Sequence, residues 1–406
     1  MTMPALRAAL AAALSVPLAL AAPAASVAWA ADDDPAKVGP VKIGMVTTLS
    51  TKAGYLGADV RDGFRLAIKQ GGGALGGVPV NLLVEDDDRD PGKGREIAER
   101  FVTRDDVKIM TGIIFSNVAL AVIPKVVKDG VIYVSPNAGP SQLAGKGCHP
   151  YHFNVAWQND NLHEAMGQYA TDAGFERMVI LAPNYPAGKD ALAGFKRFYT
   201  GGTVVSEVYT TLGQSDYAAE IAGIRNAEPD AVFFFLPGGM GINFMKQVHQ
   251  AGLGESVQLI GSGFSADHKL LNAVGAAADG MLNSAQWSPD LDTPVNAAFV
   301  AAYRAEYDAV PTIYSQQGYD AALAIGAALE ATGGDLSDLD AFAAALKQAD
   351  FASPRGDFRF GTNNFPVQDI YLRKAVMDPD GTLRNEVQGV IFEDHVDAYA
   401  AACAMK

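Results

Sequence analysis

The stretch KIGMVTTLSTKAGYLGADVRDGFRLAI, residues 42–68, decides the fold. The apolar and β-branched residues of 41–46 favour a buried strand. From Leu56 onward apolar residues recur at helical spacing, until a triple glycine at 71–73 ends the helix. A strand, a turn and a helix in this order form the repeating unit of parallel α/β sheets.

The same unit recurs after this stretch, with a fresh start after Phe153. We predict further strands at 80–85, 108–112, 131–135, 178–182, 203–209, 231–236 and 257–260. We predict further helices at 91–104, 119–128, 161–173, 188–199, 294–307, 315–332 and 339–349. The last part changes to antiparallel strands joined by polar turns, at 357–360, 368–376 and 387–392. The pattern predicts two similar α/β blocks, whose ligands bind at the carboxyl ends of the strands.

The N-terminal segment 1–30 has the pattern of a secretory signal. It starts with a positive charge at Arg7, continues with the Ala- and Leu-rich run 8–22, and ends in the small-residue site around Ala30. The alternative is a membrane anchor, but the run falls short of the roughly 20 residues that a span requires. We therefore predict export, cleavage after Ala30 and no insertion into the membrane.

The net charge of −15 disfavours nucleic acid and anionic lipid as partners. The two cysteines, Cys148 and Cys403, fit a disulfide in an exported protein. The alternative is a pair of buried thiols.

Motifs for catalysis and for cofactors are missing from the sequence. It contains no P-loop, no H-E-x-x-H, no G-x-S-x-G and no G-x-G-x-x-G that follows a strand. His149 and His152 lack a third ligand nearby, and the acids of 85–90 favour a solvated turn over a cation site. The prediction is no enzyme, no metal and no cofactor.

Several segments in order resemble one family. They are the opening stretch, VEDDDRDPGKGREIAERF (84–101), TGIIFSNVALAVIP (111–124), YVSPNAGPSQL (133–143), APNYPAGKDALAGF (182–195) and GYDAALAIGAAL (318–329). Together they resemble the branched-chain amino-acid-binding protein family, which are periplasmic type I solute-binding proteins of ABC importers. The resemblance covers about 41–396.

The resemblance implies an α/β fold of two Rossmann-like lobes, joined by three crossovers with the ligand cleft between them. Lobe 1 would comprise 41–153 plus 289–359, and lobe 2 would comprise 154–288 plus 360–400. It also implies a periplasmic monomer that closes around its ligand and docks on a membrane permease.

In this family the carboxylate of the ligand lies on hydroxyl and backbone N–H groups of the first lobe. The matching positions are Ser116, Asn117, Asn137, Ala138 and Gly139. Such neutral groups form charge-assisted hydrogen bonds with a carboxylate. The alternative is that Ser116 and Asn137 cap helices.

Further positions would reach the cleft: two tyrosines in regions that reach it in relatives, Trp157 and Asn161 at the first crossing, and an apolar wall that includes Met240 and Phe264. These are Tyr55, Trp157, Asn161, Tyr185, Gly239, Met240 and Phe264. Alternatively, the two tyrosines pack on neighbours at the surface and Trp157 fills the hinge.

The sequence departs from the amino-acid binders of the family, which need an acid for the ammonium of the ligand. The segment 261–264 contains no acid, and Asn159 stands where an Asp is common. An unpaired ammonium in a closed cleft costs several kcal/mol. We therefore expect an aromatic acid such as a hydroxybenzoate or a coumarate, as some relatives with similar loops bind.

Three alternatives remain at this point. A shift in the loop alignment would make Asp267 the countercharge and the ligand a branched-chain or other amino acid. The lobes could also serve as a ligand-sensing module or as an enzyme.

Overall fold

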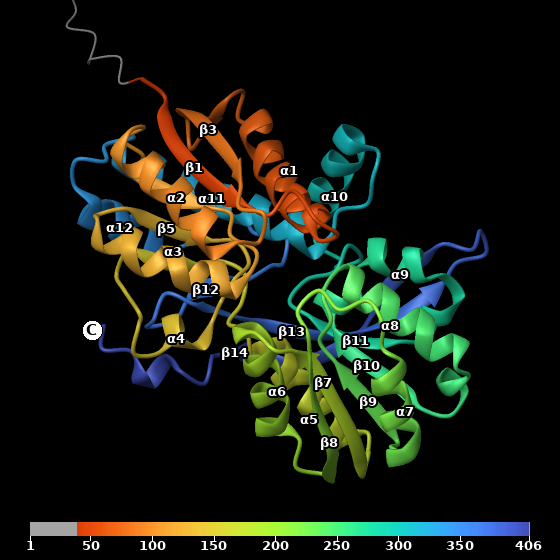
Figure 1. Ribbon diagram of the computed structural model, residues 1–406. Coiled ribbons are helices and arrows are strands. Elements are labelled where there is room, and N and C mark those ends of the chain that lie inside the picture. The colour runs from red at the N-terminus through yellow and green to blue at the C-terminus, as the bar shows by residue number, and fades with distance from the viewer. Residues whose placement is uncertain (1–38, 406) are drawn as a thin grey trace, which may run out of the picture. The chain divides into compact units, whose positions relative to one another are not determined.

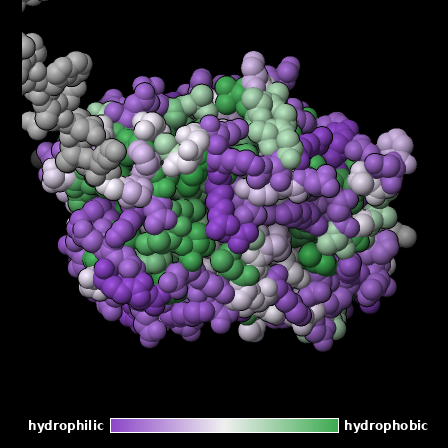
Figure 2. Space-filling model, turned by 90° about the horizontal axis from the view of Figure 1, so that it is seen from above, coloured by the Kyte–Doolittle hydropathy of each residue, from purple (hydrophilic) through white to green (hydrophobic). Residues whose placement is uncertain are grey.

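The computed structural model describes residues 39–405 (Figure 1). The predicted signal sequence 1–30 and its cleavage site after Ala30 lie outside the described residues. Within them, the strands form two separate sheets. Hydrophilic residues cover most of the face drawn in Figure 2, with hydrophobic patches between them.

The first sheet has six strands in the order β2-β3-β1-β4-β5-β6. All are parallel except β2, which pairs antiparallel with β3. Their bounds are β1 (Val41–Thr47), β2 (Ala74–Leu75), β3 (Val78–Asp86), β4 (Ile109–Thr111), β5 (Ile132–Ser135) and β6 (His152–Asn154). Strand β1 is buried almost throughout, as expected for a strand covered on both faces.

The second sheet has eight strands, in the order β12-β13-β11-β10-β9-β7-β8 with β14 beside β13. Strands β7 to β11 are parallel, and β13 joins them antiparallel. Their bounds are β7 (Arg177–Pro183), β8 (Thr203–Thr210), β9 (Ala231–Phe234), β10 (Gln258–Ser262), β11 (Leu282–Ala285), β12 (Arg359–Phe360), β13 (Pro366–Met377) and β14 (Leu383–His395). The α/β fold class of two mostly parallel sheets is thereby confirmed.

Helices cover the sheets (Figure 1). Their bounds are α1 (Gly54–Gln70), α2 (Pro91–Thr103), α3 (Ser116–Lys128), α4 (Ser141–Ala144), α5 (Asn161–Asp172), α6 (Pro186–Phe198), α7 (Ala218–Ala227), α8 (Gly239–Gln250), α9 (His268–Val274), α10 (Pro294–Tyr307), α11 (Ile313–Thr332) and α12 (Leu339–Lys347). Helix α11 packs on α1 although about 250 residues separate them. Two glycines allow this close approach, because a Cβ at Gly63 would lie 1.9 Å from the Ser315 carbonyl oxygen and one at Gly318 would lie 2.0 Å from that of Val60.

The chain passes between the sheets three times, after β6, after β11 and before β12. Arg355, in the third passage, is buried, and its hydrogen bonds connect this passage to α11 and to the first passage. Its guanidinium donates to Asp320 on α11, with Nε at 2.9 Å and Nη2 at 2.6 Å from Oδ2. It also donates to the backbone oxygens of Val155 and Ala156 in the first passage. Burial raises the pKa of Asp320, and the charge of Arg355 opposes that rise.

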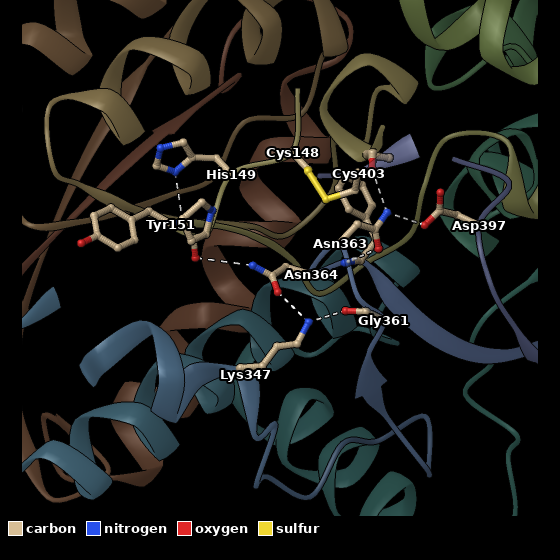
Figure 3. The surroundings of a disulfide bond; sticks show 12 residues. Cys148, His149, Tyr151, Lys347, Gly361, Asn363, Asn364, Asp397 and Cys403 are labelled. Carbon is tan, nitrogen blue, oxygen red and sulfur yellow. Dashed lines mark hydrogen bonds between the residues drawn. A yellow bond between two sulfur atoms is a disulfide. The ribbon is translucent and has the colours of Figure 1, made fainter. Parts of the chain in front are cut away.

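Cys148 and Cys403 are joined by a disulfide (Figure 3). Cys148 precedes β6 of the first sheet, whereas Cys403 follows β14 of the second. The C-terminal segment 396–405 is further held by the hydrogen bond from Asn363 Nδ2 to Asp397 Oδ2, at 2.7 Å. The segment thus adds a covalent link between elements of the two sheets.

Candidate functional site

The segments that follow the parallel strands of both sheets enclose one small cavity. The volume of the cavity is about 20 Å³, which is near the space that one water molecule requires. Its lining comes from both sheets and comprises Leu56, Ile114, Phe115, Ser116, Asn137, Ala138, Trp157, Asn159, Tyr185, Ala187, Phe235, Pro237, Phe264 and Tyr314. This is the place where open α/β sheets bind ligands.

The residues that line the cavity include no Asp, Glu, Lys or Arg. Two buried carboxylates lie beside it but are engaged elsewhere. Asp190 accepts hydrogen bonds from the Ser141 hydroxyl (2.7 Å) and from Asn159 Nδ2 (2.9 Å). Asp267 accepts from the Leu270 amide (3.1 Å) and from the Tyr55 hydroxyl (3.3 Å).

Burial is the main reason why both carboxylates have raised pKa values, and that of Asp267 rises to about 6. Neither acid lines the cavity, so an ammonium group there would have no carboxylate in the cavity wall.

The N-terminus of α3 supplies neutral hydrogen-bond donors to the cavity wall. Its N-cap is Phe115, whose side chain cannot cap, and the backbone N–H groups of Ser116 and Asn117 have no acceptor within residues 39–405. The Ser116 hydroxyl oxygen accepts from Asn159 Nδ2 at 3.1 Å, which leaves its proton for another acceptor. A helix N-terminus with such donors favours an anion.

The second predicted carboxylate loop is already hydrogen-bonded within the protein. The Ala138 amide donates to the Ile113 oxygen (3.3 Å), and the Gly139 amide donates to Asn159 Oδ1 (3.1 Å). Asn137 lines the cavity, and its carbonyl oxygen accepts from Trp157 Nε1 at 2.7 Å. Neither Ser116 nor Asn137 is an N-cap, because Phe115 and Pro140 occupy those positions.

Aromatic rings form the walls of the cavity. The ring centroids of Trp157 and Phe264 lie 3.8 Å apart at an interplanar angle of 33°. Tyr314 meets Phe264 edge to face at 5.5 Å, and Tyr185 lies parallel to Phe235 at 6.4 Å. Such walls are suited to a flat ring.

Other predicted positions do not line the cavity. Asn161 begins α5, where its side chain bonds the Gln158 amide (3.0 Å) and Glu164 (3.4 Å). Gly239 and Met240 begin α8, and Pro237, just before them, lines the cavity instead. The sulfur of Met240 accepts a hydrogen bond from the Gly213 amide.

Tyr55 and Asn117 also stay outside the lining. Tyr55 reaches Asp267, and Asn117 Oδ1 is buried without a partner within 39–405.

Eight lining residues were not among the predicted site positions: Leu56, Ile114, Phe115, Asn159, Ala187, Phe235, Pro237 and Tyr314. Phe235 reads as part of a buried strand, and Tyr314 lies in the first turn of α11. Asn159 links Gly139, Ser116 and Asp190 through one side-chain amide. A single polar residue in a loop does not reveal such a role.

Within the described residues, no group of three or more His, Cys, Asp or Glu side chains could hold a metal ion. In residues 39–405 we also find no helix with the length and apolar character that crossing a membrane requires. The acids of 85–90 serve local structure: Asp90 caps α2, and Asp87 accepts from the Thr48 hydroxyl at 2.6 Å.

Comparison with known proteins gives consistent matches along the chain. The family model described as periplasmic binding protein matches residues 40–381. The Leu/Ile/Val-binding protein homolog 6 of Brucella melitensis is 28% identical over 354 residues, which cover 85% of this chain and 90% of that protein.

Solved structures with the same fold include two from Rhodopseudomonas palustris. One is a solute-binding protein of an ABC transporter in complex with benzoate, with a TM-score of 0.85 and 30% identity, covering 90% of this chain and all of that one. The other, from strain BisB5, is in complex with 3,4-dihydroxybenzoic acid, with a TM-score of 0.81 and 30% identity, covering 88% of this chain and 99% of that one. A leucine-binding protein of Thermotoga maritima shares the fold at 21% identity and a TM-score of 0.75, covering 85% and 97% of the two chains.

Proposed function

The chain belongs to the periplasmic binding protein family, and on this premise we propose that it is the substrate-binding component of an ABC importer for an aromatic carboxylate. The observation that carries the choice of ligand is the cavity itself. It combines aromatic walls with neutral hydrogen-bond donors, and no charged side chain lines it. The relatives in complex with benzoate and 3,4-dihydroxybenzoic acid support the same class of ligand.

In this proposal the carboxylate lies at the start of α3, on the Ser116 hydroxyl and on the amides of Ser116 and Asn117. The ring lies against Trp157, Phe264 and Tyr185. Asn137 borders the carboxylate. Gly139 does not contact the ligand; its amide holds Asn159, which in turn donates to the Ser116 hydroxyl. An anion at a helix N-terminus is stabilised by the helix dipole and by the orphan amides together.

The lobes that close around the ligand are 41–153 plus 289–359, and 154–288 plus 360–400. Several contacts support closure between them. Ser141 bonds Asp190, Tyr55 bonds Asp267, and Lys269 pairs with Asp59. We further propose that the exported chain starts after Ala30, acts in the periplasm as a monomer and delivers its ligand to a membrane permease.

Leucine or another amino acid is the second candidate, favoured by the Leu/Ile/Val-binding homologues. Its ammonium would need Asp267 or Asp190 as a partner, but neither carboxylate lines the cavity, and each already accepts hydrogen bonds from within the protein. An ammonium without a partner costs several kcal/mol in a closed site.

A thermal-shift screen separates the two ligand classes. We expect 4-hydroxybenzoate, benzoate or p-coumarate to raise the melting temperature, because a ligand that binds only the native state adds about 2.7 kcal/mol at 100 times its Kd. Leucine, isoleucine and valine should leave the temperature unchanged. A shift with leucine and none with any aromatic acid would assign the site to amino acids.

We expect Ser116→Ala to weaken the binding of 4-hydroxybenzoate by about ten- to a hundredfold, because hydrogen bonds to charged groups contribute about 1.5–3 kcal/mol. Isothermal titration calorimetry measures the change. Ser262→Ala is the matched control: its hydroxyl is equally buried, has no partner within 39–405 and does not line the cavity. Equal affinities of the two variants would remove Ser116 from the site.

A further inference from the structure

A second and larger cavity, of about 350 Å³, shares no lining residue with the first. One part of its wall is the connection between α10 and α11, including Pro311, together with Ile313 at the start of α11. The opposite part comes from α9 and from the hairpin of β13 and β14 (Figure 1). The cavity therefore lies between elements that pack on the first sheet and elements of the second.

Arg373 on β13 lines this cavity and is 1% exposed. Its guanidinium donates to Asn283 Oδ1 from Nε (3.0 Å) and Nη2 (2.7 Å), and to the Trp287 carbonyl oxygen from Nη1 (3.0 Å). All these acceptors are neutral, and no carboxylate of residues 39–405 lies within 4.0 Å of it. A guanidinium has five N–H groups, so two of them remain without a protein acceptor.

Burial lowers the pKa of Arg373 to about 10, and the charges of Asp290 and Asp267 only partly counteract this. A buried cation without a close anion is costly. An anion in the cavity would therefore stabilise the buried guanidinium of Arg373.

The other charged groups of the cavity limit which anion fits. Arg384 is paired with Asp378 (2.9 Å) and Glu386 (2.7 Å), whereas exposed Arg304 on α10 has no ion pair within the described residues. Asp267 and Asp290 also line the cavity. Burial lowers the pKa of His268 to about 4, so this ring is neutral near pH 7.

The geometry points to a second binding site, which takes a small organic monocarboxylate. The acid group binds the unused N–H groups of Arg373 together with Arg304, and the apolar body lies on Pro289, Pro311 and Ile313. The fork of a guanidinium matches a carboxylate. Asp267 and Asp290 repel a doubly charged anion such as sulfate more strongly than a singly charged one.

The test is calorimetric titration of hexanoate into the protein that carries one equivalent of 4-hydroxybenzoate, so that the first site is filled and no excess remains for the second. We expect one hexanoate per chain. We expect at least tenfold weaker binding in Arg304→Gln and Arg373→Met, because each change removes a charged hydrogen-bond donor. Arg304 is exposed and has no ion pair within residues 39–405, so its variant should fold even if Arg373→Met does not. The matched control is Arg65→Gln, an exposed arginine on α1 outside the cavity.

Three outcomes would overturn the inference: no hexanoate binding to the wild-type protein, wild-type affinity in Arg304→Gln, or sulfate that binds more tightly than hexanoate. A separate titration with 4-hydroxybenzoate alone tests the proposed function. If 4-hydroxybenzoate does not bind but hexanoate does, and Arg304→Gln weakens hexanoate, the proposed function fails and the second site stands.

Discussion

Replacing Arg355 by Met lowers the free energy of unfolding by about 3–5 kcal/mol, because removing one partner of a buried ion pair leaves the other charge uncompensated. Asp320 is fully buried, and both Nε and Nη2 of Arg355 donate to it. The same guanidinium also satisfies the carbonyl oxygens of Val155 and Ala156. The loss therefore affects two passages of the chain at once. Urea unfolding of the variant and the wild-type protein measures the difference.

Two comparisons make this result specific. Arg359→Met is the matched control, because Arg359 pairs with Asp394 at the exposed surface, where such pairs contribute about 0–1 kcal/mol. The double variant Arg355→Met with Asp320→Leu should recover much of the loss, since it removes the stranded charge. Equal losses in Arg355→Met and Arg359→Met would show that the buried pair has no special role in stability.

Removing the disulfide by Cys148→Ser and Cys403→Ser together should lower the free energy of unfolding by about 2–4 kcal/mol. The bond joins residues 255 positions apart in sequence, and a cross-link over a long loop restricts the unfolded chain strongly. Chemical denaturation with and without dithiothreitol measures the effect.

The reductant supplies the control for this prediction. Dithiothreitol should bring the wild-type protein to the unfolding midpoint of the double variant and leave the variant unchanged. A wild-type midpoint that does not respond to the reductant, with both thiols shown to be free, would contradict the prediction.

Long, strongly patterned elements could be predicted from the sequence. Helix α10 has the predicted bounds, because Pro294 fits the first turn and Thr293 caps it. Strand β1 was evident from its apolar run. Helices α7, α8 and α9 were missed for local reasons: α7 buries only Ile221 and Ile224, α8 begins with two glycines among its first three residues, and α9 has seven residues.

The residues that line the cavity were predictable where they follow strand ends. Ser116, Asn137, Tyr185 and Phe264 follow β4, β5, β7 and β10, and the carboxyl ends of parallel strands meet at one edge. Tyr314 could not be found in this way, because tertiary packing brings the first turn of α11 to the cavity. The occupied amides of Ala138 and Gly139 likewise depend on partners distant in the chain or in another loop.

The contact between the Trp157 and Phe264 rings has a kinetic consequence. A benzene ring does not fit into about 20 Å³, so a ligand enters only after the two walls have moved apart. At high ligand concentration the observed association rate should then level off at the rate of this opening, instead of rising in proportion to concentration. Stopped-flow mixing followed by tryptophan fluorescence would measure that plateau directly.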